Sequence, residues 1–186
     1  MTLTLVTYTD TVIPAVSSKC PCIIFGPASV LSFMRVSPPV RLEIYESEFS
    51  TDKKIVLLRQ AAATNPSDWF GWVNPSLIPA TVSLHRLDRL SPQLFHFTTS
   101  DEPRFDPKRI GSPSYHCIAG DAYLLHSSSI HYFAYLYESY IRPDRPADSD
   151  QVLWTRILSD RPDLFQAHGH GYGQILKLLT PSLTTQ

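Results

Sequence analysis

The segment from His168 to Gly173 combines two imidazoles with an unusual concentration of glycine. It holds three of the seven glycines of the chain, and all seven histidines lie between His85 and His170. Glycine gathered in one short segment indicates backbone that turns tightly or approaches another group closely. The imidazoles of His168 and His170 suit a metal ion or a phosphate, and the alternative is a tight turn with solvent-exposed histidines.

A second candidate is the pair Asp150 and Gln151, which stands at the start of a predicted helix. A carboxylate at a helix N-terminus faces the positive end of the helix dipole, so simple capping explains it. The functional alternative is that the carboxylate and the amide point into a cleft.

The run from Trp69 to Asn74 is aromatic and ends in a polar residue and a proline. Such a run is typical of a buried strand that ends in a loop. Polar groups just beyond strand ends are where open α/β sheets place their ligand contacts, so Asn74 is a candidate for binding.

Two segments, beginning at His96 and His126, match the pattern His-x-Ser/Thr that two-histidine phosphoesterases use. Such an enzyme needs the two motifs on facing strands, whereas His126 opens an apparent helix. A phosphoesterase is therefore a minor alternative.

The elements that must position these residues alternate between strand and helix patterns. The predicted strands are 3–7, 23–25, 40–45 and 70–73, and residues 115–125 are predicted as strand, turn, strand. The predicted helices are 53–63, 128–140 and 149–158, with a short one within 28–35, and residues 76–118 do not follow a clear pattern. The alternation predicts an α/β protein with a mostly parallel central sheet, and neither a P-loop nor a dinucleotide-binding fingerprint occurs.

Length and composition limit the class of protein. The 186 residues predict a single domain, 1–186, and 16 Lys and Arg against 17 Asp and Glu argue against a nucleic-acid partner. The sequence contains no run of 18 apolar residues, so no membrane span is predicted. Residues 1–8 alternate apolar residues with threonine, which is typical of a strand and not of a signal peptide. With three cysteines, an odd number, we expect reduced thiols and a cytoplasmic protein.

The ordered set of segments resembles the HtrL/YibB–WlaTC family of putative glycosyltransferases, as a shortened and divergent member. The resemblance rests on Lys54–Leu58, Asn65-Pro66 and Trp69–Asn74, then on Ile118–Tyr123, and finally on Asp150–Leu153, Pro162–Phe165 and Gly169–Gly173.

The resemblance implies a GT-A-like fold, a three-layer α/β sandwich that binds a nucleotide-sugar at the carboxyl ends of its strands. It implies transfer of a sugar from a nucleoside-diphosphate donor to an acceptor hydroxyl of an unknown glycan or protein. It places Thr7, Tyr8, Asn74, Gly120 and Asp121 at the donor and Asp150 and Gln151 at the reacting centre.

The resemblance also implies a Mn²⁺ or Mg²⁺ ion, with His168 or His170 completing its ligands. Where the family has aspartate after the tryptophan, this chain has Asn74, whose amide is a poorer ligand for a hard cation than a carboxylate. We therefore expect weakened metal binding, and a non-catalytic GT-A-like binding protein remains the alternative.

Overall fold

The computed structural model describes residues 1–100, 117–141, 149–171 and 174–179. Its main strands are β1 (Leu3–Tyr8), β3 (Cys22–Gly26), β5 (Val40–Ile44), β6 (Trp69–Val73), β7 (Phe95–Ser100), β8 (Cys117–His126) and β9 (Phe165–His170). Its α-helices are α1 (Ala28–Leu31), α2 (Lys54–Thr64), α3 (Ser127–Tyr140) and α4 (Asp150–Asp160). Shorter pieces are the strands β2 (Ala15–Val16) and β4 (Arg35–Val36) and the 3₁₀ turns η1 (Thr51–Lys53), η2 (Pro75–Leu77), η3 (Leu87–Arg89), η5 (Pro162–Leu164) and η6 (Gln174–Leu178).

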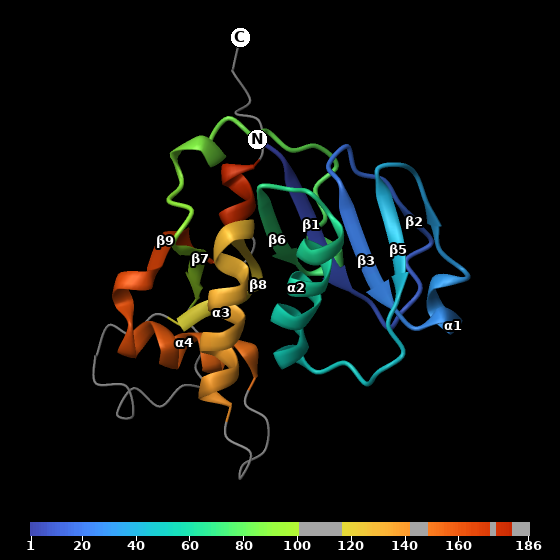
Figure 1. Cartoon of the computed structure of the whole chain (residues 1–186). Helices are drawn as coiled ribbons and strands as arrows, with labels where there is room; N and C mark the ends of the chain where they lie inside the picture. Colours follow the sequence, from blue (N-terminus) through green and yellow to red (C-terminus); the bar gives the residue numbers. More distant parts are fainter. Residues whose placement is uncertain (101–116, 142–148, 172–173, 180–186) are drawn as a thin grey trace.

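The seven main strands form one sheet in the order β5-β3-β1-β6-β8-β7-β9 (Figure 1). β8 is antiparallel to both neighbours, and the other pairings are parallel. This arrangement confirms the predicted α/β fold with a mostly parallel sheet.

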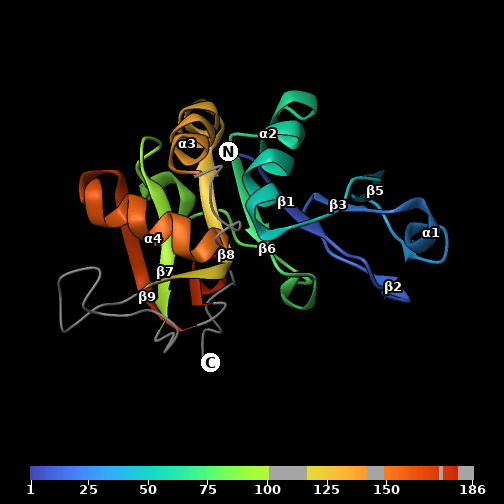
Figure 2. The ribbon, with the colours of Figure 1, turned by 90° about the horizontal axis from the view of Figure 1, so that it is seen from below.

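Helices α2, α3 and α4 cover one face of the sheet, and Figure 2 shows α2 and α3 side by side above it. Phe70 and Trp72 point into this face, while Trp69 and Val73 point to the other, because successive side chains of a strand alternate. The opposite face is covered by shorter segments, including α1, β4 and η6. The central sheet thus lies between two layers.

Several predicted boundaries agree closely with the structure. β1, β3, β6, α2, α3 and α4 each overlap the predicted element. The predicted helix within 28–35 is only the four-residue α1, and β7 and β9 were not predicted as strands. Across the described ranges, no helix is both long enough and apolar enough to cross a bilayer.

Candidate functional site

A cavity of about 510 Å³ lies at the carboxyl edge of the sheet, where β1 and β6 end. Following the sequence, β3 and then β5 lie on one side of β1 in the sheet, and the next strand, β6, lies on its other side. The strand order therefore reverses at this position, which is where open α/β sheets bind ligands. The cavity is lined by Tyr8, Thr9, Asp10, Thr11, Ile13, Phe49, Pro75 and Ser76.

An aromatic stack forms one side of this cavity. The Tyr8 ring lies parallel to that of Phe49, with 4.0 Å between centroids, and Phe49 lies parallel to Trp72 at 6.2 Å. Burial and the nearby Asp10 carboxylate raise the pKa of the Tyr8 phenol. Of the two residues predicted at the end of β1, Tyr8 lines the cavity, whereas the Thr7 side chain is buried within the sheet.

The turn after β1 is fixed by one hydroxyl. The Thr9 hydroxyl donates to the Thr11 carbonyl at 2.7 Å and accepts from the Thr11 N–H at 3.2 Å. Asp10, between them, is exposed. Thr9, Asp10 and Thr11 all line the cavity, and the Thr9 hydroxyl is used to hold the turn.

The end of β6 is tied to an irregular part of β8. The Asn74 N–H donates to the Asp121 carbonyl at 2.8 Å, which extends the β6–β8 ladder by one bond. On its other side β8 bulges: Phe97 pairs with Tyr123 and Thr99 with Ile118, so residues 119–122 lie opposite Thr98 alone. The predicted strand, turn and strand are thus one strand with this bulge, hereafter the β8 bulge (residues 119–122); Tyr115 and His116 lie outside the described residues.

A buried ion pair lies against the β8 bulge. The Lys54 Nζ is 2.9 Å from the Asp150 Oδ2, donates to the Gly120 carbonyl at 2.6 Å, and lies 5.5 Å from the centre of the Trp72 ring. Burial raises the pKa of the Asp150 carboxyl, while the Lys54 ammonium acts in the opposite direction. A side chain on Gly120 would meet the Asp150 carboxylate at 3.3 Å, which explains the glycine.

The start of α4 places Asp150 in this pair. Ser149 caps the helix, since its hydroxyl accepts from the Val152 N–H, and the Asp150 N–H donates to the Thr51 hydroxyl. Asp150 is 3% exposed and is not among the residues that line the cavity, and Gln151 is half-buried beside Gly120. Contacts therefore join the predicted residues Asn74, Gly120, Asp121 and Asp150, although the chemical roles predicted for them stay predictions.

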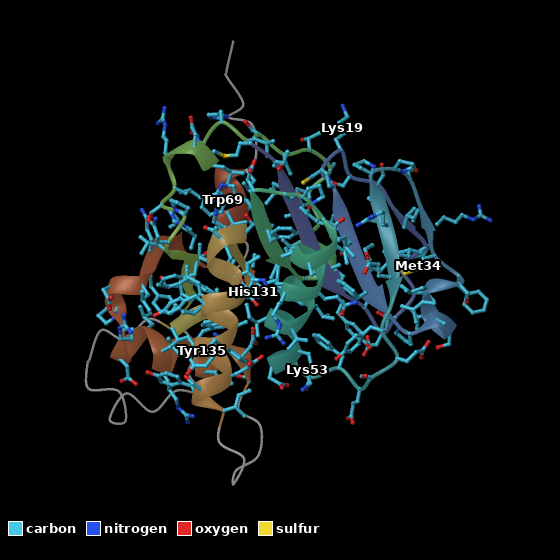
Figure 3. All side chains as sticks on the ribbon, viewed as in Figure 1. Lys19, Met34, Lys53, Trp69, His131 and Tyr135 are labelled. Atoms are coloured by element: carbon cyan, nitrogen blue, oxygen red, sulfur yellow. The ribbon has the colours of Figure 1, made fainter. Side chains whose placement is uncertain are left out.

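His168 does not lie with Asp150. Its Nε2 is 2.8 Å from the Nδ1 of His96, which is fully buried and points to the face opposite α4. Alternation along β7 and β9 turns this histidine pair to the face opposite Asp150, so of the two histidines predicted as metal ligands, His168 does not share a cleft with Asp150. In Figure 3, Trp69, which contacts His96, and Lys53, at the start of α2, lie at opposite ends of the sheet.

The glycine-rich segment does contain the special backbone that its composition predicts. Gly169 and Gly171 have φ values of 100° and 103°, and the Gly171 N–H donates to the Thr99 carbonyl. The His170 backbone pairs with Thr99 at the end of β9, and its side chain, like Tyr172 and Gly173, lies outside the described residues.

The geometry of His96 argues against the phosphoesterase alternative. Both nitrogens of His96 are already engaged, by the Ser91 carbonyl and by His168, and the ring is buried. Both His96 and His126 lie against Trp69, at 5.5 and 5.1 Å between ring centroids. His96 is therefore not available to act on a substrate.

Within the described ranges, no group of three or more His, Cys, Asp or Glu side chains is placed to hold a metal ion. The cavity offers oxygen atoms from Asp10, Thr9, Thr11 and Ser76. Magnesium in proteins is bound through one or two carboxylates together with water and substrate phosphates. These residues therefore fit a cation that arrives with a phosphorylated ligand, rather than one held by the protein alone.

Neither a family model nor a curated protein sequence matches the chain. Among solved structures, it is similar to a glycosyltransferase involved in the glycosylation of the major capsid of PBCV-1, with 14% identity and a TM-score of 0.50 over 91% of this chain and 83% of that one. It also aligns with CMP:2-keto-3-deoxy-manno-octonic acid synthetase complexed with CTP, with 7% identity and a TM-score of 0.47 over 92% and 91%. The chain thus has a GT-A-like fold, which the sheet order and the flanking helices also support.

Proposed function

We propose that this protein is a glycosyltransferase that binds a nucleoside-diphosphate sugar in the cavity at the ends of β1 and β6. The observation that carries the proposal is the position of the cavity at the point where the strand order reverses. Its volume of about 510 Å³ is within the usual range for small-molecule sites. The glycosyltransferase of similar fold adds support for this class of reaction.

The charges of the cavity favour binding that depends on a divalent cation. None of its eight described lining residues is a lysine or an arginine, and Asp10 is negative. A diphosphate in such a site needs an added positive charge, which Mn²⁺ or Mg²⁺ supplies when bound. Asp10 and Asn74 are the residues that we propose to lie nearest this cation.

The proposed reaction forms a bond between an acceptor oxygen and the anomeric carbon of the sugar. The bond between that carbon and the diphosphate breaks, the diphosphate leaves with the electron pair of that bond, and the acceptor hydroxyl passes its proton to the departing diphosphate or to water. Tyr8 and Phe49 provide apolar surface for the nucleoside, and Thr11 and Ser76 provide polar contacts. The acceptor we propose is a glycan or a protein, and membership of the HtrL/YibB–WlaTC family is part of the same proposal.

One observation favours the second candidate, a GT-A-like protein that binds the donor without transferring its sugar. Asp150, the carboxylate predicted at the reacting centre, is buried and paired with Lys54. A carboxylate so engaged does not readily accept a proton from an acceptor. Transfer of radiolabelled sugar from a bound donor distinguishes the two candidates, because the second binds donor and transfers nothing, even to water.

Thermal unfolding in the presence of uridine, guanosine, cytidine and adenosine diphosphates tests donor binding. At least one diphosphate should raise the melting temperature with Mn²⁺ and fail to do so with EDTA. A ligand at a hundredfold excess over its Kd stabilises the native state by about 2.7 kcal/mol.

Two matched variants assign such binding to the cavity. Thr11→Trp fills the cavity and should abolish the shift, whereas Val12→Trp changes a neighbouring exposed residue outside the lining and should preserve it. Equal binding by both variants would locate the nucleotide elsewhere and contradict the proposal.

A further inference from the structure

The Lys54–Asp150 pair occupies a position that neither packing nor the cavity lining explains. Both side chains are more than nine-tenths buried, and they come from the starts of α2 and α4, 96 residues apart in the sequence. Replacing a buried ion pair by apolar residues of similar volume is often neutral or stabilising. Its presence here therefore suggests a task other than stability.

The contacts of the pair lead to the end of β6. The Lys54 ammonium binds the Asp150 carboxylate and the Gly120 carbonyl together, at 2.9 and 2.6 Å. The next carbonyl of the β8 bulge, that of Asp121, accepts the Asn74 N–H at 2.8 Å. Consecutive peptides of one bulge thus join the ion pair to Asn74.

The bulge depends on these contacts because one neighbouring strand does not hold it in register. Residues 119–122 lie opposite Thr98 alone on the β7 side, so the ladder there is interrupted. On the face covered by helices, the Lys54 ammonium donates to the Gly120 carbonyl of the bulge. The Asp150 N–H donates to the Thr51 hydroxyl at 3.1 Å, which holds Asp150 in place. Asn74 is followed at once by Pro75 and Ser76, which line the cavity.

We propose that Lys54 and Asp150 are positioning residues, whose buried ion pair holds the β8 bulge and through it sets the place of Asn74 beside the cavity. This inference rests on the proposed function only for its consequence, the binding of a nucleoside diphosphate. The mechanical link from Lys54 to Asn74 stands independently of any ligand.

The test uses the double variant Lys54→Met/Asp150→Leu, because a single change leaves an unpaired buried charge that is strongly destabilising. The matched control is Arg59→Met/Glu138→Leu, which removes an α2–α3 ion pair of 3.0 Å that does not contact the bulge. Amide hydrogen exchange followed by NMR reports each backbone N–H separately.

In the Lys54→Met/Asp150→Leu variant, the Asn74 amide should exchange about tenfold faster than in the wild type, whereas the Trp72 amide should exchange at the wild-type rate. In the control variant, both amides should exchange at the wild-type rate. An unchanged Asn74 amide overturns the inference. A uniform acceleration across β6 and β8 overturns it as well, because the pair would then only stabilise the fold.

Calorimetry with the four nucleoside diphosphates and Mn²⁺ tests the consequence. The variant should bind the diphosphate that the wild type binds about tenfold more weakly, and the control should bind it normally. Full affinity in the variant overturns the positioning role while donor binding stands. If the wild type binds none of the four, the proposed function fails, and the exchange of the Asn74 amide still decides the role of the pair.

Discussion

Among single residues, Asn74 is the one that we propose, with Asp10, to lie nearest the cation. Its N–H is held by the Asp121 carbonyl, and its half-buried side chain follows the last residue of β6. An amide offers a cation only a dipole, whereas a carboxylate adds a full negative charge. In the proposed site, Asp10 and the ligand's own phosphates would therefore supply most of the attraction for a cation.

Asn74→Asp should strengthen Mn²⁺ binding in the presence of a nucleoside diphosphate. The physical reason is the full negative charge that a carboxylate would place beside the cation, and calorimetry of Mn²⁺ with and without the diphosphate measures the effect. Unchanged Mn²⁺ affinity would mean that the cation is not bound near Asn74.

The two histidines of β9 supply a further prediction about the cation. His168→Ala should leave Mn²⁺ binding unchanged, because His168 pairs with His96 on the face opposite the ion pair. His170→Ala should weaken Mn²⁺ binding, because the resemblance implies His170 as the other candidate ligand and a neutral imidazole contributes one donor nitrogen. The same calorimetric titration of both variants decides the question, and loss of binding in His168→Ala would contradict the placement of the site.

Among the elements, β1 and β3 meet closely at the point where the cavity begins. A Cβ on Gly26, the last residue of β3, would lie 2.5 Å from the Thr9 carbonyl oxygen, which is backbone and cannot rotate away. The glycine thus allows the end of β1 to approach β3 and sets the position of the Thr9–Thr11 turn.

Gly26→Ala should destabilise the fold by about 1–3 kcal/mol and also weaken nucleotide binding, because the turn after β1 must shift. Gly71→Ala is the matched control: its Cβ would meet the flexible ends of Leu124 and Leu5 at 2.8 and 3.0 Å, away from the cavity. Denaturant unfolding and nucleotide titration of both variants separate the two effects. Equal nucleotide affinities in the two variants would argue against the role of the β1–β3 approach.

For the whole molecule, the buried His96 links stability to pH. Its Nε2 must carry the proton that the Ser91 carbonyl accepts, so its Nδ1 accepts a hydrogen bond from His168. Burial, with a smaller contribution from His168, lowers the pKa of His96 from 6.5 to about 4, although the Ser91 carbonyl acts in the opposite direction. The folded protein therefore keeps this ring neutral where the unfolded chain protonates it.

The free energy of unfolding should fall as the pH drops from 6.5 to about 4, by at most about 3 kcal/mol from this residue. The sign follows because the unfolded chain binds more protons throughout that range. Urea unfolding at several pH values measures the slope, and His96→Gln should flatten it. An equally steep slope in His96→Gln would assign the pH dependence to other groups.

The sequence by itself determined the class of fold and most of the elements. The patterns that predicted them are local: apolar residues alternate in β1, they form a continuous run in β6, and they recur at helical spacing in α2, α3 and α4. Such patterns can be recognised without knowing which distant residues are in contact. β7 and β9 were not predicted, because their short mixed segments become strands only by pairing with β8 and with each other.

Only the tertiary structure decided which candidate residues meet. The sequence identifies Asp150 as a polar residue at the start of a helix. Its partner Lys54 is 96 residues away, and no local pattern predicts a contact between residues so far apart in the sequence. The resemblance implies His168 or His170 as a metal ligand, and only the alternation of side chains along β7 and β9 shows that His168 lies on the face opposite Asp150. The cavity also needed the full fold, since Tyr8, Phe49 and Ser76 come together only after the sheet order brings β1 beside β6.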